Sequence, residues 1–384
     1  QATATYAYDG AVYDGTLTLN STVFLYNSPG RHGYTVASAA GDDTYGITYI
    51  MSNDETCCIW DGLVVSITGP ADQRISVGWN ASGIVVSAVY AYDGATYPGD
   101  LTLNSTTFQY STVGKRGYTV VSGVGNDPYG IMAIITNDET WCIWDGLVIT
   151  FSGPFDQRIN IGENASGIVV RATYAYDGGL YNGDLTLNST TFLYNTVGRR
   201  AYTVTSAAGN DVYGITAIVS NAVTHCVWDA LEVHILGPDD ARIDVGTEAT
   251  GILATATYAY DSTEYDGTLV LNSTVFSRDT VGRLGYTVSS ALGDDSYGIT
   301  AILSNDITSC IWDALDIQIS GPADARIGVG ETAVGISATA TYAYDGTAYD
   351  GTLNLNSTVF VYNDVGRHGY TVASAAGDDS YGIT

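Results

Sequence analysis

The chain repeats itself every 84 residues. The phrase Tyr-Ala-Tyr-Asp recurs without insertion or deletion, and it begins at Tyr6, Tyr90, Tyr174, Tyr258 and Tyr342. The phrase Trp-Asp keeps the same interval at Trp60, Trp144, Trp228 and Trp312. A strict period of this kind predicts a tandem array of similar small domains. Such arrays serve reach, rigidity or multivalency more often than catalysis.

The composition and the local patterns indicate an all-β chain. The sequence has 45 glycines and 30 tyrosines but only two methionines, and no amphipathic pattern of helix length is present. In the unit 230–313, short alternating segments such as Thr268–Asn272 are separated by turn signals such as Gly237–Asp240. An 84-residue unit is large enough for one core of its own. Each unit is therefore predicted to be an antiparallel β-sandwich of about seven short strands.

The repeat also predicts the domain boundaries. The closing Trp-Asp segment runs into the first strand of the next unit without a Gly/Ser or Pro linker. A junction this short predicts sandwiches stacked end to end in a stiff rod. The predicted domains are 1–61, which lacks its opening strands, 62–145, 146–229, 230–313, and 314–384, which lacks its closing strand.

The segment Tyr344–Leu355 resembles a known family. Its Asp-Gly turn is followed by Gly-Thr-Leu-Asn-Leu, which is similar to the bacterial Ig-like repeats of invasin- and intimin-type adhesins. The segments Gly285–Val288 and Tyr297–Ala301 also resemble strands of that family, and similar tandem units occur in archaeal cell-surface proteins. The resemblance implies an Ig-like fold and a cell-surface location, and it transfers no catalytic residue.

The charge balance excludes several partners. The net charge is −28 and Lys115 is the only lysine, so we expect no binding to nucleic acid or to anionic membranes. The excess of acidic residues is typical of a solvated extracellular surface or of a surface that binds divalent cations. The alternative is that it only keeps the protein soluble. No run of eighteen apolar residues is present, so we expect no transmembrane segment.

Two kinds of sequon occur in the chain, and their asparagines are candidate glycosylation sites. Asparagine is glycosylated where it is exposed at Asn-x-Ser/Thr in a secreted protein. The alternative is that these residues only end a strand and start a turn. Asn-Ser-Thr occurs at Asn20, Asn104, Asn188, Asn272 and Asn356, and Asn-Ala-Ser occurs at Asn80 and Asn164.

Recurrent aspartates are candidate calcium ligands at the junctions. Carboxylates that converge there would bind Ca²⁺ through hard oxygen ligands and stiffen the array. Two alternatives stay open: aspartate is an ordinary turn residue, and the recurrent arginine at Arg74, Arg158, Arg242 and Arg326 would pair with one of these carboxylates instead. The candidates are Asp61, Asp145, Asp229 and Asp313 after the tryptophan, and Asp72, Asp156, Asp240 and Asp324 in the next turn.

The cysteines leave two interpretations open. Equivalent cysteines in successive units lie too far apart to form a disulfide, so each is expected to be a small buried apolar residue. Cys57 is the extra cysteine, and its equivalents are Trp141, His225 and Ser309. So variable a position is expected to be exposed, which makes Cys57 the best candidate for a disulfide with a neighbouring chain.

The sequence favours a structural role. We expect a rigid extracellular rod, fibre or sheath that self-associates head to tail or laterally, with strand exchange through the incomplete end domains. The alternative is an adhesin stalk, or a repeat module that binds a glycan or a surface protein. We do not expect an enzyme, since no zinc spacing, nucleophile elbow or phosphate loop is visible and the four histidines do not recur in every copy.

Overall fold

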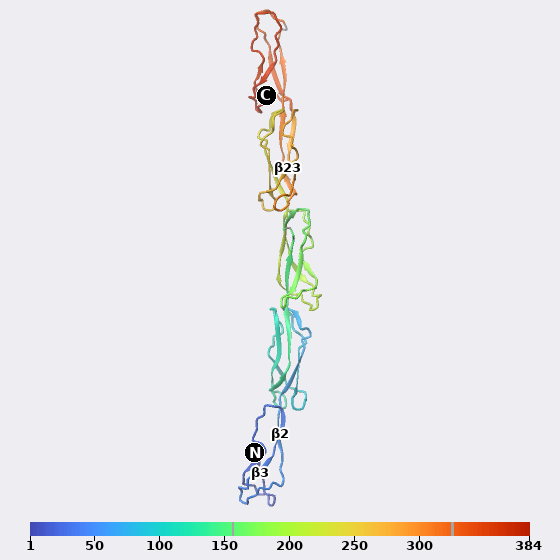
Figure 1. Cartoon of the computed structure of the whole chain (residues 1–384), viewed down its shortest axis with the longest axis vertical. Coiled ribbons are helices and arrows are strands. Elements are labelled where there is room, and N and C mark those ends of the chain that lie inside the picture. Colours follow the sequence, from blue (N-terminus) through green and yellow to red (C-terminus); the bar gives the residue numbers. More distant parts are fainter. Residues whose placement is uncertain (156, 324–325) are drawn as a thin grey trace. The chain divides into compact units, whose positions relative to one another are not determined.

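The computed structural model describes residues 1–155, 157–323 and 326–384. Its regular elements are all strands, and no described residue is helical (Figure 1). No helix able to span a membrane is therefore found among these residues. By its internal contacts the chain divides into two compact units. Unit 1 comprises Gln1–Thr150, Val170–Asn188 and Thr203–Ala222, and unit 2 comprises Phe151–Val169, Ser189–Tyr202 and Val223–Thr384.

Unit 1 holds the first two repeats and part of the third. Two of its strands, β12 and β14, have most of their residues in this unit. Its strands are β1 (Leu17–Leu19), β2 (Gly30–Tyr34), β3 (Val36–Ala39), β4 (Thr56–Trp60), β5 (Leu63–Thr68), β6 (Arg74–Ser76), β7 (Val85–Tyr90), β8 (Leu101–Leu103), β9 (Gly114–Gly123), β10 (Ile134–Asn137), β11 (Glu139–Asp145), β12 (Leu147–Ser152), β14 (Val169–Tyr174), β15 (Leu185–Leu187), β17 (Val204–Ala207) and β18 (Ile218–Asn221).

Unit 2 holds the rest of the third repeat and the last two repeats. Its strands are β13 (Arg158–Asn160), β16 (Gly198–Tyr202), β19 (Thr224–Asp229), β20 (Leu231–Leu236), β21 (Arg242–Asp244), β22 (Leu253–Tyr258), β23 (Leu269–Leu271), β24 (Gly282–Tyr286), β25 (Val288–Ala291), β26 (Ile302–Asn305), β27 (Thr308–Asp313), β28 (Leu315–Ser320), β29 (Ser337–Tyr342), β30 (Leu353–Leu355) and β31 (Val372–Ala375).

The second repeat shows how one copy is built. Its strands form two sheets, in the orders β10-β5-β7 and β6-β11-β9-β8. The opening segment is divided between them: β5 pairs antiparallel with β7 and parallel with β10, and β6 then pairs parallel with β11 in the other sheet. The fourth repeat has the corresponding order β22-β20-β26 and β21-β27-β24. The predicted all-β fold of tandem Ig-like sandwiches is confirmed, and the opening segments of the second, third and fourth repeats pair in parallel with strands of both sheets.

The second and fourth repeats each have two hydrophobic clusters. The opening cluster forms around β5, whose alternate residues Leu63, Val65 and Ile67 point inward and pack against Tyr90 and Val120. Strict alternation on a half-buried strand produces this pattern. The tryptophan cluster of the same repeat contains Ile75, Ala81, Tyr118, Cys142 and Trp144. Equivalent tryptophan clusters surround Trp228 and Trp312.

Candidate functional site

An arginine is buried where the tryptophan cluster of one repeat meets the next repeat. Arg74 opens the short strand β6, and its pairing with β11 sets Arg74 opposite Ile143, two residues before Asp145. Its Nε donates a hydrogen bond of 2.8 Å to Oδ2 of Asp145. The Asp145 side chain is fully buried and that of Arg74 is 8% exposed. A charge this deeply buried requires a partner of opposite charge, and Arg74 and Asp145 are partners of each other.

The same guanidinium also reaches into the third repeat. Its Nη1 and Nη2 donate to the two carboxylate oxygens of Asp177, at 2.9 and 3.1 Å. Its central carbon lies 4.4 Å from the ring centre of Tyr174 and 4.5 Å from that of Tyr213. The Tyr174 ring is held in turn, because its hydroxyl donates to Asp211 at 2.6 Å. Bidentate pairing and stacking between rings suit the planar guanidinium of arginine and not the ammonium of lysine.

This arrangement, which we call the arginine clamp, recurs twice within unit 2. Arg158 donates to Asp229 at 2.7 Å and to Asp261 at 3.1 and 3.0 Å. Arg242 donates to Asp345 at 2.6 Å, and its Nε forms an ion pair with Oδ2 of Asp313 at 3.1 Å without a hydrogen bond between these two atoms. The flanking rings are Tyr258 and Tyr297 for Arg158, at 4.3 and 4.5 Å, and Tyr342 and Tyr381 for Arg242, at 4.8 and 4.6 Å.

The aspartate of each Trp-Asp phrase also connects successive repeats, because its Oδ1 oxygen accepts hydrogen bonds from backbone amides of the next repeat. Oδ1 of Asp145 accepts hydrogen bonds from the backbone amides of Gly146, at 2.8 Å, and Tyr176, at 2.9 Å. Asp61, Asp229 and Asp313 accept the corresponding pairs of amides. Together with the clamp, these bonds connect the end of one repeat to two separate segments of the next.

A second polar contact lies near each clamp. Oγ of Ser76 accepts from the backbone amide of Thr216 at 2.9 Å. The equivalent acceptors are Oδ1 of Asn160, for Thr300 at 2.7 Å, and Oδ1 of Asp244, for Thr384 at 2.9 Å. The residue type changes at this position but an acceptor oxygen is kept, so every described clamp is accompanied by a contact of the same kind.

The clamp predicts resistance to mild acid. Hydrogen bonds from Arg158 lower the pKa of Asp261 to about 2, and bonds from Thr347, followed by Arg242, lower that of Asp345 to about 2. Because the folded pKa lies below the ordinary value of about 3.9, the stabilisation is complete above that pH and is lost as the pH falls through 2. Hydrogen exchange of the 258–261 segment should stay slow down to about pH 3. Asp261→Asn should abolish the acid-dependent step, and a step that remains in this variant would contradict the assignment.

The predicted calcium ligands do not converge in the structure. Asp145, Asp229 and Asp313 pair with arginine, which is the alternative left open by the sequence, and Asp72 and Asp240 lie in exposed turns. Asp156 and Asp324 lie outside the described residues. Across 1–155, 157–323 and 326–384, no group of three or more His, Cys, Asp or Glu is close enough to hold a metal ion. Calcium binding at the junctions stays a prediction.

The other predicted sites are placed as follows. Cys57 is exposed, as its variable position suggested. The recurrent cysteines Cys142, Cys226 and Cys310 are buried as expected, but their equivalent Cys58 is exposed, so the expectation is wrong for the first repeat. An intermolecular disulfide at Cys57 stays a prediction. All seven sequon asparagines are exposed, namely Asn20, Asn80, Asn104, Asn164, Asn188, Asn272 and Asn356.

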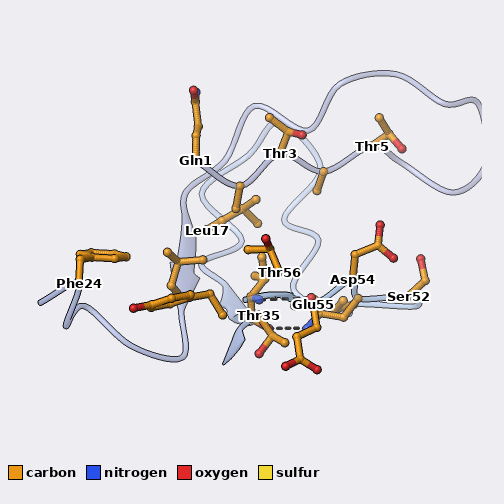
Figure 2. A pocket seen from close by; sticks show the side chains of 17 residues that line it. Gln1, Thr3, Thr5, Leu17, Phe24, Thr35, Ser52, Asp54, Glu55 and Thr56 are labelled. Carbon is orange, nitrogen blue, oxygen red and sulfur yellow. Dashed lines mark hydrogen bonds between the residues drawn. The ribbon is translucent and has the colours of Figure 1, made fainter. Parts of the chain in front are cut away.

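The first repeat has an open groove where the second repeat has β5. The groove has a volume of about 530 Å³ and is lined by segment 1–5, by Leu17 and Leu19, and by Ile50 and Ser52–Thr56. Figure 2 shows Gln1, Thr3 and Thr5 on one side and Ser52, Asp54, Glu55 and Thr56 on the other. In the second repeat the equivalents of these two segments, β7 and β10, both pair with β5.

The ring-lined half of the clamp was not predicted. Neither the tyrosines nor Asp177, Asp261 and Asp345 are named as partners of the arginine in the sequence analysis. A signal was present: the arginine and the aspartate of the next repeat are always 103 residues apart. This spacing exceeds one period, so a search within a single unit does not reveal it.

Comparison with known proteins adds little. No family model and no curated protein matches the chain. Among solved structures, the crystal structure of the Protocadherin GammaB4 extracellular domain is similar with a TM-score of 0.20 and 8% identity, over 85% of this chain. The match spans 64% of that protein, less than two thirds of its length, and a TM-score this low carries no functional argument.

Proposed function

We propose that the chain is a structural protein of an extracellular surface, in which tandem Ig-like sandwiches form a stiff rod, fibre or sheath. The arginine clamp is the observation that carries this proposal. One buried guanidinium forms ion pairs with carboxylates of two successive repeats at each of three junctions, in place of a flexible linker. The excess of acidic residues, with its net charge of −28, supports an extracellular location.

The clamp resists bending for an electrostatic reason. If the third repeat swung away from Arg74, the guanidinium would lose Asp177 and both tyrosine rings, and Asp145 would lose the amide of Tyr176. Separating a buried, hydrogen-bonded charge from its partners is strongly unfavourable. A junction held in this way has one preferred arrangement, which is the property a rod or sheath requires.

The experiment compares the full chain with two triple variants of equal charge change. Arg74→Gln/Arg158→Gln/Arg242→Gln removes the three clamps, whereas Arg171→Gln/Arg199→Gln/Arg283→Gln changes three exposed arginines. We expect single-particle images to show a narrow distribution of end-to-end length for the natural chain and the control, and a broad one for the clamp variant. A natural chain as flexible as the clamp variant would contradict the proposal.

We propose strand exchange as one means of polymerisation, because the groove of the first repeat is lined like a site for one more strand. A strand with the pattern of β5, apolar at Leu63, Val65 and Ile67, suits a groove whose flanking segments lack such a partner. An added strand gains backbone hydrogen bonds and buries alternate side chains. The strand would come from an earlier segment of the same protein or from another copy, and in the second case it would join two chains.

The strand proposal is tested with a synthetic peptide. A peptide of residues 62–69 should slow hydrogen exchange in segments 3–6 and 50–53 of the full chain. The same peptide with Val65→Asp, which places a charge where a buried valine stands, should have no effect. Equal exchange with either peptide would exclude strand addition at this groove.

A further inference from the structure

The fold uses the Asn-Ser-Thr motif as a clasp between strands. Oδ1 of Asn104 accepts a hydrogen bond from the amide of Thr119 at 3.2 Å, and its Nδ2 donates to the carbonyl of Gly117 at 3.1 Å. Both partners belong to β9, so the side-chain amide extends the ladder between β8 and β9. The same two bonds recur at Asn20, Asn272 and Asn356, and Oδ1 of Asn188 accepts from Thr203 at 3.1 Å.

The serine of the motif is used in the same way in every repeat. Oγ of Ser105 accepts the amide of Thr107 at 3.1 Å, which closes a tight turn after β8. Equivalent bonds are made by Ser21, Ser189, Ser273 and Ser357. The first two residues of each Asn-Ser-Thr motif therefore have a role in folding.

The two Asn-Ala-Ser sequons are placed differently. Asn80 and Asn164 lie in loops after β6 and β13, and each makes only an isolated backbone bridge, to Gln109 and to Leu193. Both asparagines are exposed, and no hydrogen bond of either side chain occurs among the described residues. Their Nδ2 atoms are therefore available in the folded chain, whereas those of the clasps are held against a strand.

We propose that Asn80 and Asn164 are the N-glycan acceptors of the folded chain, and that the five Asn-Ser-Thr asparagines are clasps that stay unmodified. The donor would be an oligosaccharide linked to a lipid pyrophosphate. Its anomeric carbon forms a bond to Nδ2 as its bond to the phosphate oxygen breaks, and one Nδ2 proton leaves as the lipid pyrophosphate departs. A nitrogen engaged with a strand carbonyl must first leave it, and two hydrogen bonds of the clasp break when the side chain turns outward.

The clasp predicts a large difference in reactivity. Breaking both of its hydrogen bonds reduces the available fraction of the asparagine roughly tenfold or more. Glycans would then occur on the second and third repeats, because the equivalent positions of the fourth and fifth repeats are Glu248 and Thr332. In the living cell this modification rests on the proposed extracellular location.

The experiment uses the purified, folded full chain and therefore does not depend on where the chain resides. It is incubated with a lipid-linked oligosaccharide and a single-subunit oligosaccharyltransferase that accepts any Asn-x-Ser/Thr, and glycopeptides are quantified by mass spectrometry. Proteolytic peptides of the same chain, which have no clasp, are treated in parallel.

We expect the folded chain to be modified at Asn80 and Asn164, at least about tenfold faster than at Asn104 and Asn272. All four should react in the peptides. Equal rates in the folded chain would overturn the proposal, and so would the same preference in the peptides, because it would then belong to the sequon and not to the clasp. Failure to modify Asn80 in the folded chain, with modification in the peptide, would overturn its assignment as an acceptor. A cytoplasmic location would refute the proposed function and leave these rates unchanged.

Discussion

Replacing Arg74 by glutamine should cost about 3–5 kcal/mol of local stability at the junction between the second and third repeats. The reason is the burial of Asp145, whose side chain has no exposed surface and would be left without its cationic partner. Asp177 would be less affected, since 45% of its side chain is exposed. The chain contains several folding units, so the measurement is native-state hydrogen exchange of the full chain, read in β11 and in segment 174–177.

A double variant separates the charge effect from a simple loss of packing. In Arg74→Gln/Asp145→Asn the buried charge is gone, while the asparagine Oδ1 still accepts the amides of Gly146 and Tyr176. This variant should be more stable than Arg74→Gln alone. Arg74→Lys should fall between the natural chain and Arg74→Gln, because lysine supplies charge without the planar fork. A loss below about 1 kcal/mol in Arg74→Gln would reduce the clamp to an ordinary surface ion pair.

The repeated fold was predictable because its signals lie within one period. The alternation in Leu63, Val65 and Ile67 indicates a strand with one buried face, and the structure buries these residues in the opening cluster. The change of sheet between β5 and β6 was not predicted. A turn at Gly69–Pro70 is visible in the sequence, but periodicity does not tell which strand pairs with each side of it, or that β5 and β6 run parallel to β10 and β11.

The junction was predictable only in part, because its residues come from two repeats. Pairing of Arg74 with Asp145 was one of the alternatives that the sequence left open, and both residues belong to the second repeat. Asp177 and the ring of Tyr213 belong to the third repeat, where the motif signals turns and core packing. The sequons also could not be distinguished from the sequence. Asn104 and Asn80 both satisfy the pattern Asn-x-Ser/Thr, and only the hydrogen bonds of Asn104 to β9 separate the clasp from the proposed glycan acceptor.

The glycine in the turn where the opening segment changes sheet should be the glycine at which substitution destabilises each repeat most. Gly69 has a φ of +89°, and a Cβ there would lie 1.9 Å from the carbonyl oxygen of Gly83. The equivalent glycines Gly153, Gly237 and Gly321 approach Gly167, Gly251 and Gly335 equally closely. A contact this short forces two backbone segments apart, in addition to the strain that a left-handed backbone imposes on alanine. We expect Gly69→Ala to destabilise the second repeat by about 3–5 kcal/mol, as overpacking and left-handed strain add.

Gly78 provides the matched control within the same repeat. Its φ is +84°, close to that of Gly69, but a Cβ there would meet no atom within 4 Å. Gly78→Ala should therefore cost only the backbone strain, about 1–2 kcal/mol. Hydrogen exchange in β5 and β7 measures both variants in the full chain. Equal losses would mean that the strain of a left-handed residue explains the whole effect and that the contact of Gly69 with Gly83 adds nothing. A larger loss in Gly69→Ala would show that this contact sets the point at which the opening segment changes sheet, and with it the position of Arg74 for the clamp.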